Sequence, residues 1–359
     1  MFKIYQKYII NNFILKFLTV SIIFFCLVII LGVLDEISFF KNLDANVLYP
    51  YFLTILNAPI TLFEIFPFIF LLTTQYLFYD LFKKDELNLL KKNGISNLTV
   101  IKILFLLSLI MGLFTVIVYY NFASKLKFHY TSIKNDFSND NKYLAMVTNS
   151  GLWIKDEIND TVIITKAQYI KDSILTDAII NEFSKNFELI RTIQAKNIEI
   201  KTNEWVIRDP LITKENISTN NQKVVTLNTN FNYDKINQLF SNISTLNIFE
   251  LFDLKNDYED LGYSSNEIYI HLLKLFSMPV FYGVLTILSS IIMFNFKKDK
   301  SLLFHIILGI LMSVVIYYMN FMFNSLGNNG KIPIYLSIFF PILIITLISI
   351  IGMVRINEK

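Results

Sequence analysis

The residue types that most often carry chemistry are few and scattered in this sequence. The three histidines, His129, His271 and His305, have no second histidine or paired cysteine at metal-ligand spacing, so the sequence predicts no metal site. The stretch GNNGK, Gly327–Lys331, has too few residues between its glycines for a phosphate loop and no Ser or Thr after its lysine. No nucleophile motif or Cys–His pair occurs. We therefore predict that the chain is not an enzyme, and that any nucleotide driving it binds to another protein.

Two charged positions lie within or beside apolar segments. Glu64 is a carboxylate within an apolar segment, and because burying a charge in a membrane is costly, such a residue often marks a functional site. The alternative is that Glu64, which is near the end of its segment, simply reaches water. Lys274 follows Glu267 by two helical turns, so both fall on one helix face. This pair is either a solvated helix end or a place where Lys274 meets an anionic group such as a lipid phosphate.

A short charged stretch, KKDELNLLKKNGIS (Lys83–Ser96), separates two very apolar runs. Its spacing predicts a helix in which the Asp85 carboxylate accepts backbone N–H groups and Asn93-Gly94 forms a left-handed stop. The expected apolar stripe comprises Leu87, Leu90 and, at its edges, Leu89 and Ile95. Such a helix either enters a groove on a soluble partner or rests on the membrane surface.

The charged residues described above lie within or between six apolar runs of about twenty residues each. This is the length that crosses the hydrocarbon core of a membrane. The chain is 54% hydrophobic with a mean hydropathy of +0.49, and within the runs only Lys16 and Glu64 are charged. Pro59 and Pro67 predict a kinked or broken start to the second run. The runs are Phe13–Leu34, Thr61–Tyr79, Ile103–Phe122, Leu275–Phe296, Leu302–Phe323 and Ile332–Val354. The sequence therefore predicts a polytopic membrane protein.

The lysines predict the orientation of these spans. Lysines gather before the first run, between the second and third runs, and between the fourth and fifth runs, whereas the first connection is acidic. Positively charged connections stay cytoplasmic, so both termini are predicted to be cytoplasmic. The net charge of +3 is thus a topology signal and does not indicate nucleic-acid binding.

A long polar insertion between the third and fourth runs is predicted to lie outside the cytoplasm. Segments rich in Ile, Val, Thr and aromatic residues alternate there with turn residues, which is typical of a sandwich, jelly roll or small barrel. The predicted strands are Gly151–Asp156, Thr161–Ala167, Phe187–Lys196, Glu204–Asp209 and Lys223–Leu227. Helices are predicted at Ser124–Asp136, extending the third run, and at Tyr233–Tyr263, returning to the membrane.

The predicted fold class is therefore an α-helical membrane protein with six transmembrane helices, three on either side of an inserted β domain. Residues 1–122 hold the first three spans and include the short helix at 84–94. Residues 123–266 form the β domain with its helical return, and residues 267–359 hold the last three spans.

Several motifs follow one another along the chain. They are Ala58-Pro59 with Phe66-Pro67, then DELNLLKKNG after the second run, GLWIKD at Gly151–Asp156, the pattern Glu267…Lys274…Pro279, and GKIP at Gly330–Pro333. Together, in this order, they resemble the LptF/LptG permease family of lipopolysaccharide exporters. The resemblance covers essentially the whole chain. GLWIKD is similar to the LptG branch rather than the LptF branch.

The resemblance implies a periplasmic β-jelly-roll domain in an inner-membrane protein that pairs with a paralogous permease on a cytoplasmic ATPase dimer. That ATPase would use ATP and Mg, and this chain would need no cofactor. Lipopolysaccharide would leave the outer leaflet of the inner membrane for a periplasmic jelly-roll bridge protein and a membrane-anchored bridge subunit. The ATPase-coupling residues would be Asp85, Glu86, Leu87, Leu90 and Gly94.

The first and fifth spans would then form a lateral gate toward the partner permease. Family members carry basic residues at the outer end of the first span, but here GVLDEISFFK has Asp35 and Glu36 with only Lys41 basic. Lys41 and Lys274 are therefore the residues expected to meet lipid phosphates.

Three alternative functions remain open at this point. One is another force-transmitting permease, for lipoprotein export or control of cell-wall hydrolases, although such proteins usually place one span before the external domain. A membrane enzyme acting on lipids would need an acid, base or nucleophile set that the sequence lacks. A sensor would not need six spans.

Overall fold

Two compact units, each with its own core, make up the chain. They comprise Met1–Lys127 with Asn266–Lys359, and Phe128–Ser265. The structure, a computed structural model, describes residues 3–41, 46–137, 152–158, 161–171, 173–214, 217–219, 223–233, 235–236, 242–260, 264–295 and 301–357.

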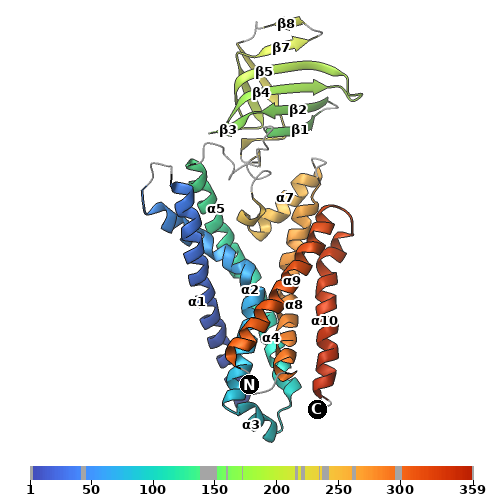
Figure 1. Cartoon of the computed structure of the whole chain (residues 1–359). Helices are drawn as coiled ribbons and strands as arrows, with labels where there is room; N and C mark the ends of the chain where they lie inside the picture. The colour runs from blue at the N-terminus through green and yellow to red at the C-terminus, as the bar shows by residue number, and fades with distance from the viewer. Residues whose placement is uncertain are drawn as a thin grey trace. The chain divides into compact units, whose positions relative to one another are not determined.

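The first unit contains six helices that are long and apolar enough to cross a membrane, counted over the described residues (Figure 1). They are α1 (Ile4–Phe40), α2 (Tyr49–Lys83), the third span (Asn97–Lys134), α8 (Asn266–Asn295), α9 (Leu302–Asn328) and α10 (Ile334–Asn357). The six predicted spans are thus confirmed. Each helix is longer than its apolar run, since helical hydrogen bonding continues into the polar residues at its ends.

The third span is one continuous helix made of three stretches. These are α4 (Asn97–Phe114), a π-helical stretch η1 (Thr115–Tyr120) and α5 (Asn121–Asp136). The Ser96 hydroxyl caps its start by accepting the Thr99 N–H at 3.2 Å. The predicted extension of this span beyond the apolar run is confirmed.

Small residues bring α4 and α8 close together. A Cβ atom on Gly112 would lie 2.6 Å from the Pro279 backbone Cα, so only glycine fits there. One turn away, the Ser108 and Thr286 hydroxyls form a buried hydrogen bond of 2.8 Å. Small side chains and interhelical hydrogen bonds of this kind hold helices together in lipid, where the hydrophobic effect cannot.

The second span, α2, contacts α1, α8 and α9. It continues as one helix through Pro59 and Pro67, so of the predicted kink or break the break is wrong and the kink stays a prediction. Packing against neighbouring helices stabilises a proline-containing membrane helix. Phe70 of α2 stacks on Tyr282 of α8 with ring centroids 4.5 Å apart, and the Tyr119 hydroxyl donates to the Pro59 carbonyl at 3.1 Å.

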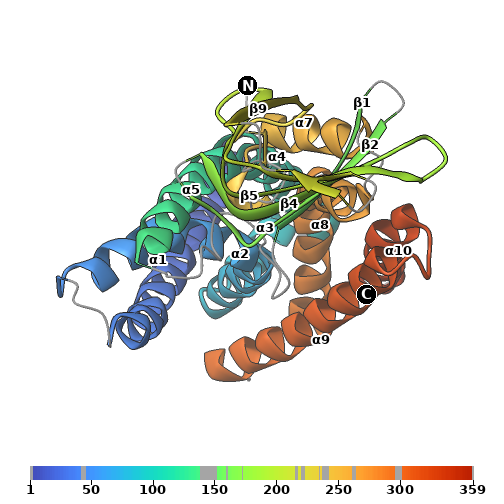
Figure 2. The same ribbon diagram turned by 90° about the horizontal axis from the view of Figure 1, so that it is seen from above.

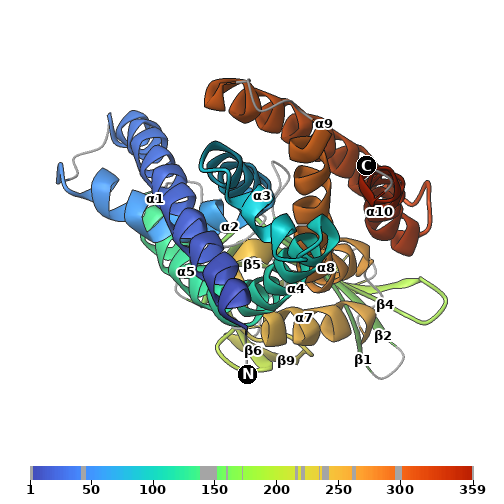
Figure 3. The ribbon, with the colours of Figure 1, turned by 90° about the horizontal axis from the view of Figure 1, so that it is seen from below.

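The outermost helices of this unit expose rows of large apolar side chains. Viewed from below, α1 lies on one side of the unit, and α9 with α10 lies on the other (Figure 3). Ile22, Leu31, Leu311 and Val315 are each more than half exposed. Such faces suit contact with lipid or with another membrane helix.

The second unit is built on a curved antiparallel sheet, seen from above in Figure 2. Among the described residues this sheet has nine strands. Its main strand order is β1-β2-β4-β5-β6-β9, β3 pairs with β4, and β7 pairs with β5 and β8. The strands are β1 (Leu152–Ile158), β2 (Thr161–Ala167), β3 (Tyr169–Lys171), β4 (Ile174–Phe183), β5 (Leu189–Glu199), β6 (Glu204–Arg208), β7 (Leu211–Lys214), β8 (Ile217–Thr219) and β9 (Val224–Asn228). The predicted fold class, membrane helices with an inserted antiparallel β domain, is confirmed.

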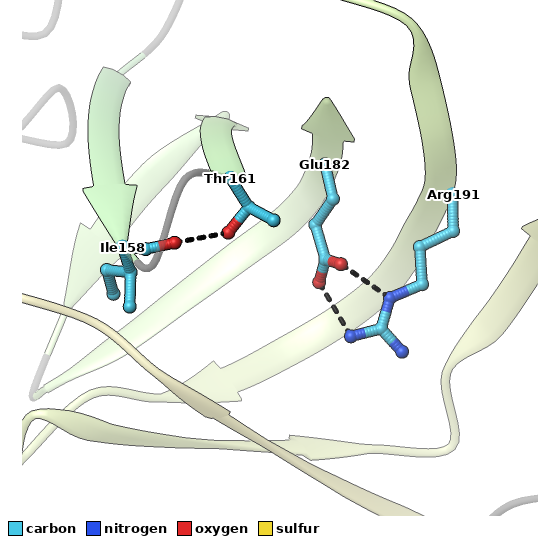
Figure 4. Close-up of polar contacts among 4 residues, drawn as sticks. All are labelled: Ile158, Thr161, Glu182 and Arg191. Atoms are coloured by element: carbon cyan, nitrogen blue, oxygen red, sulfur yellow. Dashed lines mark hydrogen bonds and ion pairs between the residues drawn. The ribbon is translucent and has the colours of Figure 1, made fainter. Parts of the chain in front are cut away.

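The sheet core is apolar and its ends are fixed by polar contacts. Ile180, Ile193 and Trp205 are almost fully buried, and Trp205 Nε1 donates to the Phe231 carbonyl at 2.8 Å. Glu182 and Arg191 face each other across β4 and β5 and form a bidentate pair of 2.7 and 2.8 Å (Figure 4). The hydrogen bond to Glu182 raises the pKa of Arg191 above its usual value.

Several predicted elements of the second unit need correction. Strands β3, β4, β7 and β8 were not predicted, and Phe187 lies outside β5 in a turn with φ of 60°. Within the predicted helical return, Tyr233–Tyr263, the described residues include helical residues at 233 and 235–236, a short 3₁₀ turn, η2 (Ile243–Thr245), and helix α7 (Ile248–Asp260). Gly151 and residues 234, 237–241 and 261–263 lie outside the described residues.

Candidate functional site

The short helix predicted between the second and third spans is present as α3 (Glu86–Lys92). Its start differs from the prediction, because Asp85 has φ of 58° and its carboxylate accepts no backbone N–H of the helix. A capping residue needs an extended backbone, whereas the tight corner after α2 requires a left-handed one. Asp85 Oδ1 instead accepts a hydrogen bond from the Asn88 amide at 2.8 Å.

The predicted stop of α3 is confirmed. Gly94 has φ of +77°, its N–H donates to the Lys91 carbonyl at 2.9 Å, and the Ile95 N–H donates to the Leu90 carbonyl at 3.0 Å. This is a Schellman motif, which satisfies carbonyls that the helix end would otherwise leave unpaired. The corner at Asp85 and the stop at Gly94 hold α3 rigidly between two membrane spans.

The faces of α3 differ from the predicted stripe. Leu87 is only 4% exposed and faces its own chain, where α3 contacts α2, and Leu90 is half-buried. Leu89 is 55% exposed, and Lys91 and Lys92 are exposed too. The surface available to a partner therefore combines an apolar side chain with two lysines.

Glu86 is the acidic residue of the first turn of α3. It is half-buried, and its Oε2 accepts a hydrogen bond of 2.7 Å from the Tyr8 hydroxyl of α1. A carboxylate at a helix N-terminus is favoured by the exposed N–H groups there. Glu86 is thus held in place but remains accessible to a cation on another protein.

A cavity of about 270 Å³ lies among α2, α8, α9 and α10 within the first unit. Most of its wall is apolar, and the polar groups concentrate on α8 and α9. The wall residues are Glu64, Pro67, Phe68, Leu71, Lys274, Ser277, Met278, Phe281, Leu285, Ser313, Ile316, Tyr317, Asn320, Phe321, Asn324, Ile338 and Ile342. Apolar walls with a few convergent polar groups are typical of small-molecule and lipid sites.

Glu64 and Lys274 are the charged residues of this wall. Both side chains are exposed, and Glu64 attracts Lys274 electrostatically, although the two form no ion pair among the interactions of the described residues. Charges act more strongly on each other beside apolar surface than in water, because the effective dielectric constant is lower. Lys274 is therefore placed to attract an anionic group entering the cavity.

The other residues singled out from the sequence lie elsewhere. Lys41 is exposed at the end of α1 and does not line the cavity, and residues 42–45 after it lie outside the described residues. Glu267 is exposed in the first turn of α8 and does not line the cavity either. The structure thus places Lys274 in the same cavity wall as Glu64, whereas Glu267 and Lys41 lie outside that wall.

Two asparagines and the ion-pair partner of Lys16 were missed by the sequence reasoning. Asn320 and Asn324 project from α9 into the cavity, and their i, i+4 spacing in an apolar run was an available signal. Lys16 of α1 forms an ion pair with Asp80 of α2. Asp80 escaped notice because it lies one residue beyond the predicted end of the second run.

The comparison with known protein families agrees with this architecture. The profile of a family described as "Lipopolysaccharide export system permease LptF/LptG" matches residues 7–355. A search of curated proteins found no match. The family match spans both helical segments and the inserted β domain, which confirms the resemblance carried by the sequence motifs. This chain belongs to the LptF/LptG family of lipopolysaccharide export permeases.

Proposed function

We propose that this chain is the LptG-type permease subunit of an ATP-driven exporter that extracts lipopolysaccharide from the outer leaflet of the inner membrane. The family match over residues 7–355 carries the proposal. The GLWIKD segment, of which Leu152–Asp156 lie in β1, favours the LptG branch over LptF. The chain itself acts as a transport subunit without catalysis.

Energy for this step has to come from another protein. Each buried methylene of an acyl chain favours the membrane by about 0.8 kcal/mol, so a lipid with several acyl chains cannot leave unaided. The sequence contains no nucleotide-binding motif. We therefore assign ATP and Mg to a cytoplasmic ATPase dimer, which pushes on Glu86 and its neighbours in α3.

The orientation follows from the distribution of charge. Lysines at both ends of α3 support a cytoplasmic location for this helix and both termini, and a periplasmic location for the β unit. A paralogous permease completes the membrane part, with α1 and α9 forming the lateral gate. The lipid then passes to a periplasmic jelly-roll bridge protein and its membrane-anchored subunit.

The lipid is recognised, on this proposal, by basic residues next to apolar surface. Lys274 meets a phosphate from within the cavity, and Lys41 meets another from the exposed end of α1. The acyl chains contact the apolar wall of the cavity and the neighbouring helix faces.

Purification of the chain from its native membrane tests the function directly. Mass spectrometry of a mild detergent extract should find lipopolysaccharide, a second permease and an ATPase in stoichiometric amounts. Proteoliposomes holding this complex should release the lipid to a soluble jelly-roll acceptor only when ATP is added. Release without ATP, or co-purification with a lipoprotein or a cell-wall hydrolase instead, would contradict the proposal.

Removing the positive charge of Lys274 should weaken lipid binding. The change Lys274→Met keeps an unbranched side chain of similar length and removes its charge, so we expect about tenfold less lipid on the purified complex, equivalent to roughly 1.4 kcal/mol. Lys274→Arg should retain most of the lipid. Lys331→Met is the matched control, because Lys331 is an exposed lysine after α9 that does not line the cavity. Equal losses in Lys274→Met and Lys331→Met would rule out a specific role for the cavity.

A further inference from the structure

The N-terminal half of α1 is attached to α2 and α3 by polar contacts. The Tyr8 hydroxyl donates to Glu86 of α3 at 2.7 Å. Two turns further along α1, Lys16 forms an ion pair with Asp80, and its ammonium lies 3.8 Å from the centre of the Tyr76 ring. Tyr76 and Asp80 are one turn apart on α2, so together they enclose the lysine from two sides.

These contacts flank an apolar layer between the same helices. Ile9, Phe13 and Phe17 are buried and follow one another at intervals of four residues, which puts them on one face of α1. Phe17 packs between Phe66 and Phe70 of α2, with ring centroids 5.9 and 4.9 Å away. Apolar packing gives this interface its area, while the polar contacts fix its register.

The partly buried ion pair is costly to break within this apolar surrounding. The Lys16 and Asp80 side chains are 21% and 26% exposed. Separating them would leave two charges beside apolar surface, so sliding of α1 along α2 is opposed. Beyond Val20, no side chain of α1 is buried until Glu36, and Ile22, Ile30 and Leu31 are more than half exposed.

We propose that Tyr8 and Lys16 bind α1 to the α2–α3 corner, so that α1 and the coupling helix move as one body. This inference rests on the proposed function, in which α3 receives force from the ATPase. Displacement of α3 then carries α1 with it and moves the exposed apolar face beyond Val20. Tyr8, Lys16 and Asp80 are positioning residues that touch neither nucleotide nor lipid.

The functional test measures lipid released per ATP hydrolysed in proteoliposomes holding the whole complex. Tyr8→Phe removes one hydroxyl, and Asp80→Asn removes the negative charge that faces Lys16. We expect each variant to assemble, to hydrolyse ATP at nearly the wild-type rate, and to release about fivefold less lipid per ATP, the effect of losing one hydrogen bond of ordinary strength. The double change Lys16→Asp with Asp80→Lys should recover most of the loss.

Matched controls come from the same helix. Tyr5→Phe removes a hydroxyl that makes no hydrogen bond among the described residues, and Lys7→Gln removes an exposed charge. Both should keep the wild-type ratio. If Tyr8→Phe and Asp80→Asn also keep it while the wild-type complex transports normally, the attachment is refuted but the exporter function stands. Failure of the wild-type complex to transport would instead refute the function.

A distance measurement tests the shared movement directly. Spin labels at Lys7→Cys and Lys92→Cys, in a Cys26→Ser background, report the separation of α1 and α3 in the reconstituted complex. In otherwise wild-type protein we expect the same narrow distribution with and without nucleotide, and a broader one after Tyr8→Phe or Asp80→Asn. A wild-type distance that changes when nucleotide binds would overturn the proposal.

Discussion

Reversal of the charge at Glu86 is expected to separate this chain from its ATPase. Glu86 is half-buried at the N-terminus of α3, where a lysine would repel the helix dipole and lose the hydrogen bond from Tyr8. A like charge facing a basic partner surface adds several kcal/mol of repulsion. We therefore expect Glu86→Lys to weaken association by at least about 100-fold, which co-purification and the ATPase rate of the detergent extract would both register.

Two further variants separate docking from general damage. Glu86→Gln keeps an acceptor for Tyr8 and should bind the ATPase with intermediate affinity. Glu188→Lys makes the same charge reversal at an exposed position of the β unit and should bind normally. An intact and active complex carrying Glu86→Lys would disprove the role of α3 in docking.

The substitution Gly112→Val is expected to have the largest effect on the helical unit itself. Its Cβ would meet the Pro279 Cα at 2.6 Å, and Tyr282 lies within 3.1 Å as well. Backbone atoms cannot move aside as a flexible side chain can, so α4 and α8 must separate. Overpacking of this kind typically costs about 1–3 kcal/mol, and here it also threatens the Ser108–Thr286 hydrogen bond beside it.

Thermal unfolding of the purified protein in detergent measures this effect. Gly112→Val should lower the midpoint by several degrees and reduce the yield of monodisperse protein. Leu113→Val, a change of size at the adjacent exposed position, should leave the midpoint near the wild-type value. A Gly112→Val protein as stable as Leu113→Val would show that α4 and α8 separate readily.

The membrane spans could be predicted from the sequence because their signal is local. A run of about twenty apolar residues has few alternatives to a membrane helix. Strand β2 was likewise predicted with its observed limits, because the segment TVIITKA is rich in β-branched residues and is set off from its neighbours by turn residues.

Strand β4 shows why other elements were missed. Leu175, Ala178, Ile180 and Glu182 are buried, a pattern that does not alternate strictly. Asp177 has φ of 47°, and the positions that are buried change from odd to even numbers across this left-handed residue, while the register with β5 is the same on both sides of it. A search for strictly alternating apolar residues therefore does not detect this strand, because its position is fixed by pairing with its neighbours on both sides.

The charged residues of the candidate site were singled out from the sequence, but not the asparagines of its wall and not the arrangement. Lys274, Glu64 and the α3 segment were identified from charge within or beside apolar sequence. The grouping of Glu64 and Lys274 depends on helix packing. It places Glu64 of α2 and Lys274 of α8 around one cavity, although 210 positions separate them along the chain. The error at Asp85 has a similar origin, because the geometry of the corner after α2 overrides the usual preference of a capping aspartate.

The π-helical stretch within the third span affects how this chain should be aligned with its relatives. A π turn closes i→i+5 hydrogen bonds and so accommodates one residue more than an α turn. Within it, the adjacent Tyr119 and Tyr120 hydroxyls bond to different partners, the Pro59 carbonyl and the His271 ring. A homologue shorter by one residue would regain an unbroken α-helix here, and the residues beyond would keep the faces they present, because the widened turn absorbs the extra residue. Single-residue gaps between related permeases are therefore expected at this turn rather than in a loop.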